Sequence, residues 1–199
     1  MPTQRARRLR KAWIAEHIKE IIKILGYNIK DVNLRGTPKR VASIFMEELD
    51  LETLRSRKIL KKLYSTTPTL YKSMVILRGH KTQTRCPHHL ERVNLNISVG
   101  YIPDKKLLGL SKLARIANYY SSGLMLQEEI AESIASGLYD ALEPKGVAVT
   151  ILAEHDCIRC RGVRSQNSDV VTSEVRGVFL EDPATREEFL RLVGGKNER

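Results

Sequence analysis

The sequence predicts an α+β fold with an antiparallel four-stranded sheet, paired helices and an N-terminal helical extension. Residues 92–102, RVNLNISVGYI, alternate apolar and polar side chains with the period of a half-buried strand. Strand-like segments occur in two consecutive pairs, and two segments with helical spacing separate the pairs. Consecutive strands favour an antiparallel sheet over a parallel βαβ repeat, so the class is α+β.

Two helices are expected before the sheet. Apolar residues recur at helical spacing over 8–25. Thr37 as the N-cap and Pro38 at the first helical position predict a second helix that ends near Leu49. Residues 50–72 are basic and irregular, and we expect a short helix and a loop there.

The remaining elements follow from changes in the period of the apolar residues. In chain order we predict strands 73–85 and 92–102, helices 111–121 and 126–142, strands 147–161 and 169–180, and a last helix over 182–193. Asp182 and Pro183 supply the N-cap and the first position of that last helix. We divide the chain into an N-terminal helical region, 1–50, and a sheet-bearing domain, 51–199, within a single structural unit.

The composition is that of a globular protein with a buried core. Apolar residues make up 42% of the 199 residues, and no run of about 18 apolar residues predicts a membrane span. Three cysteines are too few, and odd in number, for a disulfide scaffold. We therefore expect reduced thiols, a cytoplasmic location and no membrane partner.

Positive charge is concentrated in the first part of the chain. The net charge is +11, and residues 1–85 contain 20 Lys and Arg against 7 Asp and Glu. Such a balance indicates an anionic partner, either phosphates on a small molecule or nucleic acid; the alternative is an ordinary solvated surface. Aromatic residues are only 6%, and no basic stretch is interleaved with stacking side chains, which argues against nucleic acid.

Two short stretches hold all three cysteines. They read TRCPHHLERV over 84–93 and AEHDCIRCRG over 153–162. One interpretation is a closed structural zinc site formed by Cys86, His89, Cys157 and Cys160. The other is a site with three protein ligands, in which a water takes the fourth position as catalytic zinc requires.

Strand geometry favours the open site. Side chains alternate between faces along a strand, so an extended 147–161 segment would place His155 and Cys157 on one face and Cys160 on the other. The favoured ligands of Zn²⁺ are therefore Cys86, His89 and Cys157. His88 and His155 would then lie nearby without coordinating. His88 in place of His89 remains an alternative, because spacing barely separates the two.

An open zinc site flanked by histidines suits hydrolysis. Zinc lowers the pKa of a bound water to about 7, and an uncoordinated histidine can transfer protons near neutral pH. Arg161, expected on the same face as Cys157, can bind a phosphate through two hydrogen bonds. The residues alone thus indicate metal-assisted hydrolysis of an anionic substrate.

The chain also resembles the GTP cyclohydrolase I family. The motifs that carry the resemblance are CPHH at 86–89, YIPDKKLLGLSKLARI at 101–116, LQEEI at 126–130, HDCIRCRGV at 155–163 and EDPATREEFLRLV at 181–193. The resemblance is strong over 86–193 and looser at GTPKRVA, residues 36–42. It is highly specific, because the motifs occur together in the family's order and at its separations.

The resemblance implies the tunnelling fold, in which the sheets of several subunits join into a barrel, with 51–199 as the catalytic domain. It implies a homodecamer of two stacked pentamers, with active sites between subunits. The expected reaction converts GTP and water to 7,8-dihydroneopterin triphosphate and formate, starting with hydrolysis at guanine C8. Such a reaction serves tetrahydrofolate and pterin synthesis, or deazapurine synthesis.

Roles for individual residues are also implied by the resemblance. The zinc ligands would be Cys86, His89 and Cys157. The catalytic residues would be His88 and His155, which transfer protons, and Ser111, which acts at the ribose stage. Glu128 would accept hydrogen bonds from the guanine N1–H and exocyclic amine, with Gln127 binding beside it. The triphosphate would be held by Arg40, Lys112, Arg115 and Arg161.

Some of these positions also suit ordinary structural roles. Ser111 could be a helix N-cap, and Glu128 could be a first-turn acid. Two positions depart from the family pattern: Pro87 stands where glutamate is usual, and Cys160 where an apolar residue is common. The alternatives are a non-catalytic zinc protein of this fold that binds a purine nucleotide or a partner, and a related hydrolase acting on another purine.

Overall fold

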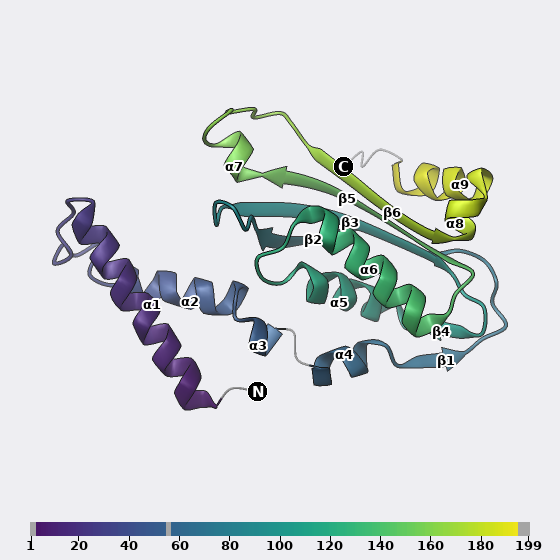
Figure 1. The fold of residues 1–199 in the computed structure, drawn as a ribbon, viewed down its shortest axis with the longest axis horizontal. Helices are drawn as coiled ribbons and strands as arrows, with labels where there is room; N and C mark the ends of the chain where they lie inside the picture. Colours follow the sequence, from purple (N-terminus) through teal and green to yellow (C-terminus); the bar gives the residue numbers. More distant parts are fainter. Residues whose placement is uncertain (1–2, 55–56, 195–199) are drawn as a thin grey trace. The chain divides into compact units, whose positions relative to one another are not determined.

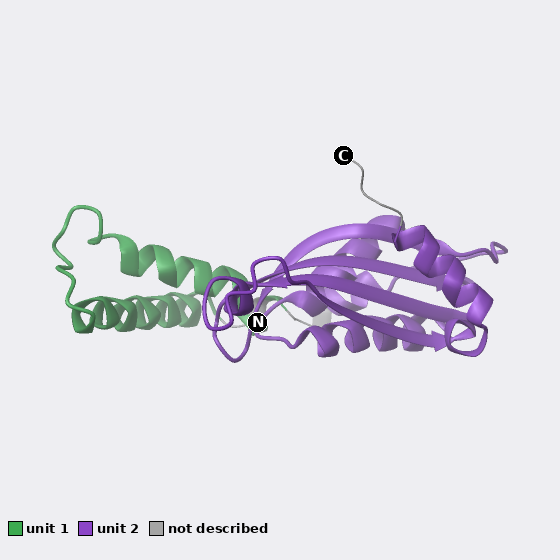
Figure 2. Cartoon of the chain, turned by 90° about the horizontal axis from the view of Figure 1, so that it is seen from above, with its two compact units in different colours: residues 1–56 green, residues 57–199 purple. Residues whose placement is uncertain are grey.

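The computed structural model describes residues 3–54 and 57–194, which belong to two compact units (Figure 2). The first unit is Met1–Ser56, and its described elements are helices. The second unit is Arg57–Arg199, and it contains both sheets. Across the described ranges, no helix is both long and apolar enough to cross a membrane.

The first unit consists of α1 (Gln4–Ile24), α2 (Thr37–Glu48) and the short α3 (Leu51–Leu54) (Figure 1). α1 begins earlier than predicted because the Thr3 hydroxyl accepts a hydrogen bond of 3.2 Å from the Ala6 N–H, which caps the helix. The buried carboxylate of Asp50 pairs with Arg7 and Arg10 of α1 at 3.3 and 3.2 Å. These ion pairs join the end of α2 to the start of α1.

The second unit is built on a four-stranded sheet. Its strands are β2 (Val75–Arg85), β3 (Arg92–Ile102), β5 (Gly146–His155) and β6 (Val170–Gly177). They lie in the order β2-β3-β5-β6, and every neighbouring pair is antiparallel. The predicted α+β class with an antiparallel four-stranded sheet is therefore confirmed. In this sheet β2 and β6 are the two edge strands.

Short elements and helices complete the second unit. They are α4 (Arg57–Leu63), β1 (Thr66–Pro68), β4 (Lys106–Leu108), α5 (Leu110–Ser121), α6 (Gln127–Leu142), α7 (Asp156–Arg159), α8 (Val178–Glu181) and α9 (Pro183–Gly194). β1 and β4 pair as a separate two-stranded antiparallel sheet. The helices α5 and α6 lie across one face of the large sheet (Figure 1).

The main core lies between the sheet and the pair α5 and α6. The alternating residues of β3 are its centre, each at most 2% exposed: Val93, Leu95, Ile97, Val99 and Tyr101. Ile130, Ile134 and Leu138 of α6 are fully buried in the same cluster. The predicted inward face of 92–102 is confirmed. A smaller cluster around Phe179 and Phe189 forms with α8 and α9.

Four local predictions are wrong. The strand expected over 169–180 ends at Gly177, and Val178–Glu181 form the helix α8. The segment 147–161 is a strand only to His155, because the Cys160 N–H donates to Asp156 O at 2.9 Å and closes a helical turn, α7. Gly36, rather than Thr37, is the N-cap of α2. The region expected to be a loop before residue 72 contains the strand β1. It is a strand because it pairs with β4, a contact that cannot be predicted from the local sequence.

Antiparallel pairing collects three strand ends at one end of the sheet. Arg85, at the end of β2, pairs with Arg92 at the start of β3. Val93 in turn pairs with His155, the last residue of β5. The loop after β2 and the turn after β5 are therefore neighbours, although they are far apart in the sequence.

Candidate metal centre and active site

A closed turn after β2 presents the first cysteine and both adjacent histidines. The Leu90 N–H donates to Cys86 O at 2.9 Å, and the Cys86 N–H donates to Glu91 O at 2.9 Å. Pro87 is the second residue of this turn, and the two hydrogen bonds come from the Cys86 and Leu90 N–H groups, so the missing N–H of proline removes neither. The departure at Pro87 is thus compatible with the turn that carries Cys86.

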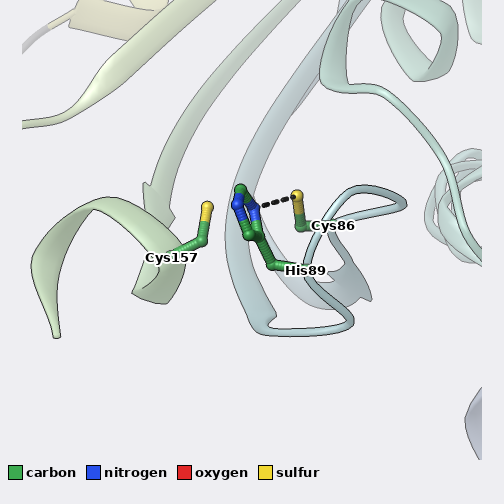
Figure 3. Close-up of side chains that lie close together, drawn as sticks. All are labelled: Cys86, His89 and Cys157. Atoms are coloured by element: carbon green, nitrogen blue, oxygen red, sulfur yellow. Dashed lines mark hydrogen bonds between the residues drawn. The ribbon is translucent and has the colours of Figure 1, made fainter. Parts of the chain in front are cut away.

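The structure brings one histidine and two cysteines together at the convergent strand ends. Among the described residues, the candidate ligand atoms that lie within 4.8 Å of one another come from Cys86, His89 and Cys157. The His89 imidazole lies between the two sulfurs (Figure 3), and its Nδ1 is 3.6 Å from Cys86 Sγ. Cys86 is buried, Cys157 is half-buried and His89 is exposed, so the group opens to one side. We call these three residues the metal group.

Burial and neighbouring groups shift the pKa of the Cys157 thiol in the metal group. Burial and the adjacent Cys86 thiol raise the pKa of Cys157, and the charge of Arg161 opposes this shift. The Cys157 thiol therefore stays protonated more readily than a free cysteine. A divalent cation between the sulfurs would reverse this preference, because it stabilises thiolates directly.

The donor set and spacing fit zinc. Two thiols and one imidazole are ligands that zinc commonly takes in proteins. At ordinary Zn–S and Zn–N bond lengths, a tetrahedral ion separates a sulfur from an imidazole nitrogen by about 3.6 Å. The separation of Cys86 Sγ and His89 Nδ1, 3.6 Å, agrees with that value.

The neighbouring candidates lie outside the metal group. His88 is exposed, and its Nδ1 is 3.8 Å from Cys86 Sγ. Cys160 is an exposed thiol at the C-cap of α7. The geometry therefore distinguishes His89 from His88, which spacing did not, and it favours the open arrangement over the closed one.

Strand alternation was the wrong reason for setting Cys160 aside. Cys157 and Cys160 lie on and beside a helical turn, where residues three apart can share a side. What separates them is the packing of the turn. Cys157 faces Cys86, whereas Cys160 faces outward.

His155 is the last residue of β5, two positions before Cys157, and its imidazole is supported by Gln127. The His155 Nε2 and Gln127 Oε1 atoms are 2.9 Å apart. Burial lowers the pKa of His155, and the charge of Glu128 acts in the opposite direction. Glu128 is exposed, so its carboxylate remains available next to an imidazole that favours its neutral form. Thr84 Oγ1 donates to Gly123 O at 2.9 Å, which holds the loop before α6 against the end of β2.

Three other predicted residues lie on α5, near the opposite end of the sheet. The Leu108 N–H donates to the Tyr101 hydroxyl at 3.0 Å, so α5 begins at the Tyr101 end of β3. Tyr101 is eight positions from Val93, or about 27 Å along the strand. Ser111 and Arg115 are exposed, and the Lys112 ammonium donates to the backbone and hydroxyl oxygens of Ser65. The N-cap of α5 is Gly109, so the capping role considered for Ser111 is wrong.

The remaining predicted basic residues lie in separate places. Arg40 belongs to the first unit, where its guanidinium donates to Thr37 Oγ1 at 2.7 Å and to Asn33 O at 3.1 Å. Arg161 is exposed in the segment after α7, close enough to influence the pKa of Cys157. The second unit alone therefore brings Arg161, His155, Glu128 and the metal group to one end.

Sequence reasoning missed the burial of Gln127, which is 4% exposed. A signal was present, because Gln127 precedes Ile130, Ile134 and Leu138 at helical spacing and so lies on the apolar side of α6. A polar side chain on the buried side of a helix needs partners in the protein.

The family profile and the curated relatives both match this protein over almost the whole chain. The sequence profile of the family described as GTP cyclohydrolase I matches residues 14–194. A GTP cyclohydrolase 1 from Aquifex aeolicus (strain VF5) is 41% identical over 184 residues, which cover 90% of this chain and 97% of the relative. A GTP cyclohydrolase 1 from Pasteurella multocida (strain Pm70) is 35% identical over 184 residues, covering 92% of this chain and 84% of the relative.

Among solved structures, the apo form of the archaeosine synthase QueF-Like matches 55% of this chain and 96% of its own, with a TM-score of 0.43 and 18% identity. The profile match and the curated relatives establish the relationship by themselves. With an antiparallel α+β fold and a Cys-His-Cys group at its convergent strand ends, the chain belongs to the GTP cyclohydrolase I family.

Proposed function

We propose that this protein hydrolyses GTP at guanine C8 and rearranges the product to 7,8-dihydroneopterin triphosphate, with release of formate. The observation that carries the proposal is that the ligand atoms of Cys86, His89 and Cys157 lie within 4.8 Å of one another in a member of this family. Curated relatives that share most of their length with this chain are named GTP cyclohydrolase 1.

Zn²⁺ is the proposed cofactor, held by the metal group. When bound, the ion would supply a Lewis acid and a water acidic enough to be a nucleophile near neutral pH. The exposed side of the group, where His89 meets solvent, leaves access for a purine. The exposed position of Cys160 supports a three-ligand site.

The residues around the metal group suit binding and proton transfer on a guanine. The Glu128 carboxylate can accept two hydrogen bonds, from the guanine N1–H and its exocyclic amine, and so orient the base. His155, whose pKa is sensitive to the charge of Glu128, would exchange a proton with the purine ring. His88 is exposed beside Cys86 and would serve the second proton transfer.

A complete site requires more than one copy of the chain in this proposal. Ser111 would act on the ribose, which adjoins C8, yet α5 begins near the end of the sheet opposite to the metal group. One subunit would therefore supply the metal group, and a neighbour would supply Ser111, with Lys112 and Arg115 for the triphosphate. Arg40 and Arg161 would complete the basic set.

The sheet offers a means of assembly. β2 and β6 are edge strands, and pairing of such edges between subunits would join the sheets into a barrel. A homodecamer of two stacked pentamers is the assembly we propose. Three unpaired cysteines are compatible with a cytoplasmic enzyme that makes precursors of tetrahydrofolate, pterins or deazapurines.

The decisive experiment is an assay of purified, zinc-loaded protein with GTP. Formate release and pterin fluorescence after oxidation are both expected. Absence of both products from metal-replete protein would contradict the proposed reaction. Parallel assays with GDP, ATP and deoxy-GTP distinguish a related purine hydrolase, and binding of GTP without turnover would indicate a non-catalytic nucleotide-binding protein.

A further inference from the structure

The buried amide of Gln127 connects β5, β6 and His155. Its nitrogen donates to Ile151 O at 3.1 Å, to Val170 O at 2.9 Å and to the Thr172 hydroxyl at 3.2 Å. Its oxygen lies 2.9 Å from His155 Nε2. The side chain is 4% exposed, so these protein groups surround it and solvent does not.

The partners fix which way the amide points. Ile151 O and Val170 O can only accept hydrogen bonds, so the NH₂ group must face them. The Gln127 oxygen is thereby directed at His155, and it too can only accept. The hydrogen between Gln127 Oε1 and His155 Nε2 must therefore sit on the imidazole. This holds whether the ring is neutral or charged, because Nε2 carries a hydrogen in both cases.

We propose that Gln127 is a positioning residue, which fixes the ring orientation and the tautomer of His155 through the contact between Gln127 Oε1 and His155 Nε2. The inference rests on the proton-transfer role proposed above for His155. It differs from the substrate-binding role that family resemblance implied for Gln127. A side chain with both amide hydrogens engaged by the protein is poorly placed to bind guanine, whereas the next residue, Glu128, is exposed and free to do so.

Two substitutions separate the contact with His155 from the contacts with the strands. Gln127→Met keeps the length of the side chain and removes all of its hydrogen bonds. Gln127→Glu keeps an acceptor for His155 Nε2 and removes the donors to Ile151 O and Val170 O. Thr172→Val is the matched control, because it removes one partner of the Gln127 nitrogen and leaves the His155 contact intact.

The first measurement is ¹⁵N NMR of zinc-loaded protein labelled at histidine, with His155→Asn used to assign the His155 signals. In the unsubstituted protein and in Thr172→Val, the neutral ring should show a protonated Nε2 and an unprotonated Nδ1. Gln127→Glu should preserve this pattern, and Gln127→Met should give a mixture of both tautomers. A ring protonated at Nδ1 in the unsubstituted protein, or an unchanged spectrum in Gln127→Met, overturns the proposal.

The second measurement is steady-state kinetics with GTP in a double-mutant cycle. Gln127→Met should lower kcat by about 10- to 100-fold with little change in KM, in the range seen when a supporting hydrogen bond is lost. In a His155→Asn background the same substitution should have almost no further effect. An equal loss in both backgrounds would indicate a purely structural role, and a raised KM that persists without His155 would indicate direct contact with substrate.

The two measurements distinguish failure of this inference from failure of the proposed function. If the protein does not turn over GTP, the kinetics report that result, and the tautomer of His155 is still decided by NMR. If Gln127→Met does not fold, the unsubstituted protein still tests the proposal, because a His155 ring protonated at Nδ1 in its spectrum overturns it.

Discussion

The two ends of the large sheet differ in how completely one chain builds them. At the end where β2, β3 and β5 converge, Cys86, His89 and Cys157 meet, and His155 is held by Gln127. At the other end, Ser111 and Arg115 are exposed, and the Lys112 ammonium donates to Ser65. In the function proposed above, the groups that act on the purine belong to one subunit, whereas Ser111, Lys112 and Arg115 belong to a neighbour.

Among the substitutions that test this comparison, removal of one proposed metal ligand should cause the largest loss of activity. Cys157→Ala should lose bound zinc and lower activity by about 1,000-fold or more, since the metal supplies the nucleophile. Cys160→Ala is the matched control, because it removes a thiol three residues away that faces outward. Zinc content by mass spectrometry and pterin fluorescence are the measurements. Equal losses in both variants would mean that the site is closed by Cys160.

Mixed oligomers test whether the two ends cooperate across subunits. His88→Ala and Ser111→Ala should each be nearly inactive as homo-oligomers, because each removes a group that acts on the same nucleoside. An equal mixture, unfolded and reassembled together, should recover roughly one quarter of the original activity, since about one site in four pairs two intact halves. Failure to recover activity, with hybrid oligomers confirmed by native mass spectrometry, would place both ends of one site in one chain.

The two acidic residues at the start of α6 test the proposed guanine-binding role of Glu128 near the metal group. Glu128→Gln should lower kcat/KM for GTP by about 100-fold, because a charged hydrogen-bond acceptor for guanine is lost. Glu129→Gln is the control, since the Glu129 carboxylate accepts a hydrogen bond from the Leu126 N–H at 3.2 Å and serves as a helix cap. That variant should keep its activity and lose about 0.3–1 kcal/mol of stability, because the amide can still accept the cap hydrogen bond but lacks the negative charge that favours a helix N-terminus. Unchanged kcat/KM in Glu128→Gln, with a large loss in Glu129→Gln, would exclude Glu128 as the residue that binds the guanine base.

The smallest effect is expected at Pro87, in the turn of the metal group. Pro87→Ala should destabilise zinc-free protein by about 0.4–1 kcal/mol, because the unfolded chain gains conformational freedom. The difference should appear in urea unfolding monitored by circular dichroism, with zinc binding retained. An unchanged or raised unfolding free energy would show that the turn does not benefit from the fixed φ of proline.

The sequence was sufficient for most of the sheet and for the metal group. The alternation in 92–102 identifies the inward face of β3 because a half-buried strand repeats every two residues. The rarity of cysteine and its spacing to histidine located the two stretches that form the metal group, but Cys157 was preferred to Cys160 for a strand geometry that ends at His155. The choice between His88 and His89 could not follow, because adjacent residues are distinguished only by the backbone of the turn closed between Cys86 and Leu90.

Other features depend on contacts between distant segments, which cannot be predicted from local sequence patterns. β1 is a strand because β4 lies beside it, and α7 replaces a strand because one turn of hydrogen bonds closes after His155. The burial of Gln127 was visible in the helical spacing of α6, yet its partners on β5 and β6 depend on the packing of that helix. Ser111 and Arg115 are exposed on α5, and their proposed roles depend on the assembly proposed above.

The positions of Cys86 and Cys157 give the metal group a thermodynamic consequence for folding. A metal ion held by both would connect residues 71 positions apart, and the turn after β2 to the turn after β5. Such a link restricts the unfolded chain much as a covalent bridge would, and binding to the folded state alone adds about 1.4 kcal/mol for each tenfold excess of free metal over its dissociation constant. The concentration of free zinc would then affect the stability of the folded protein as well as its activity.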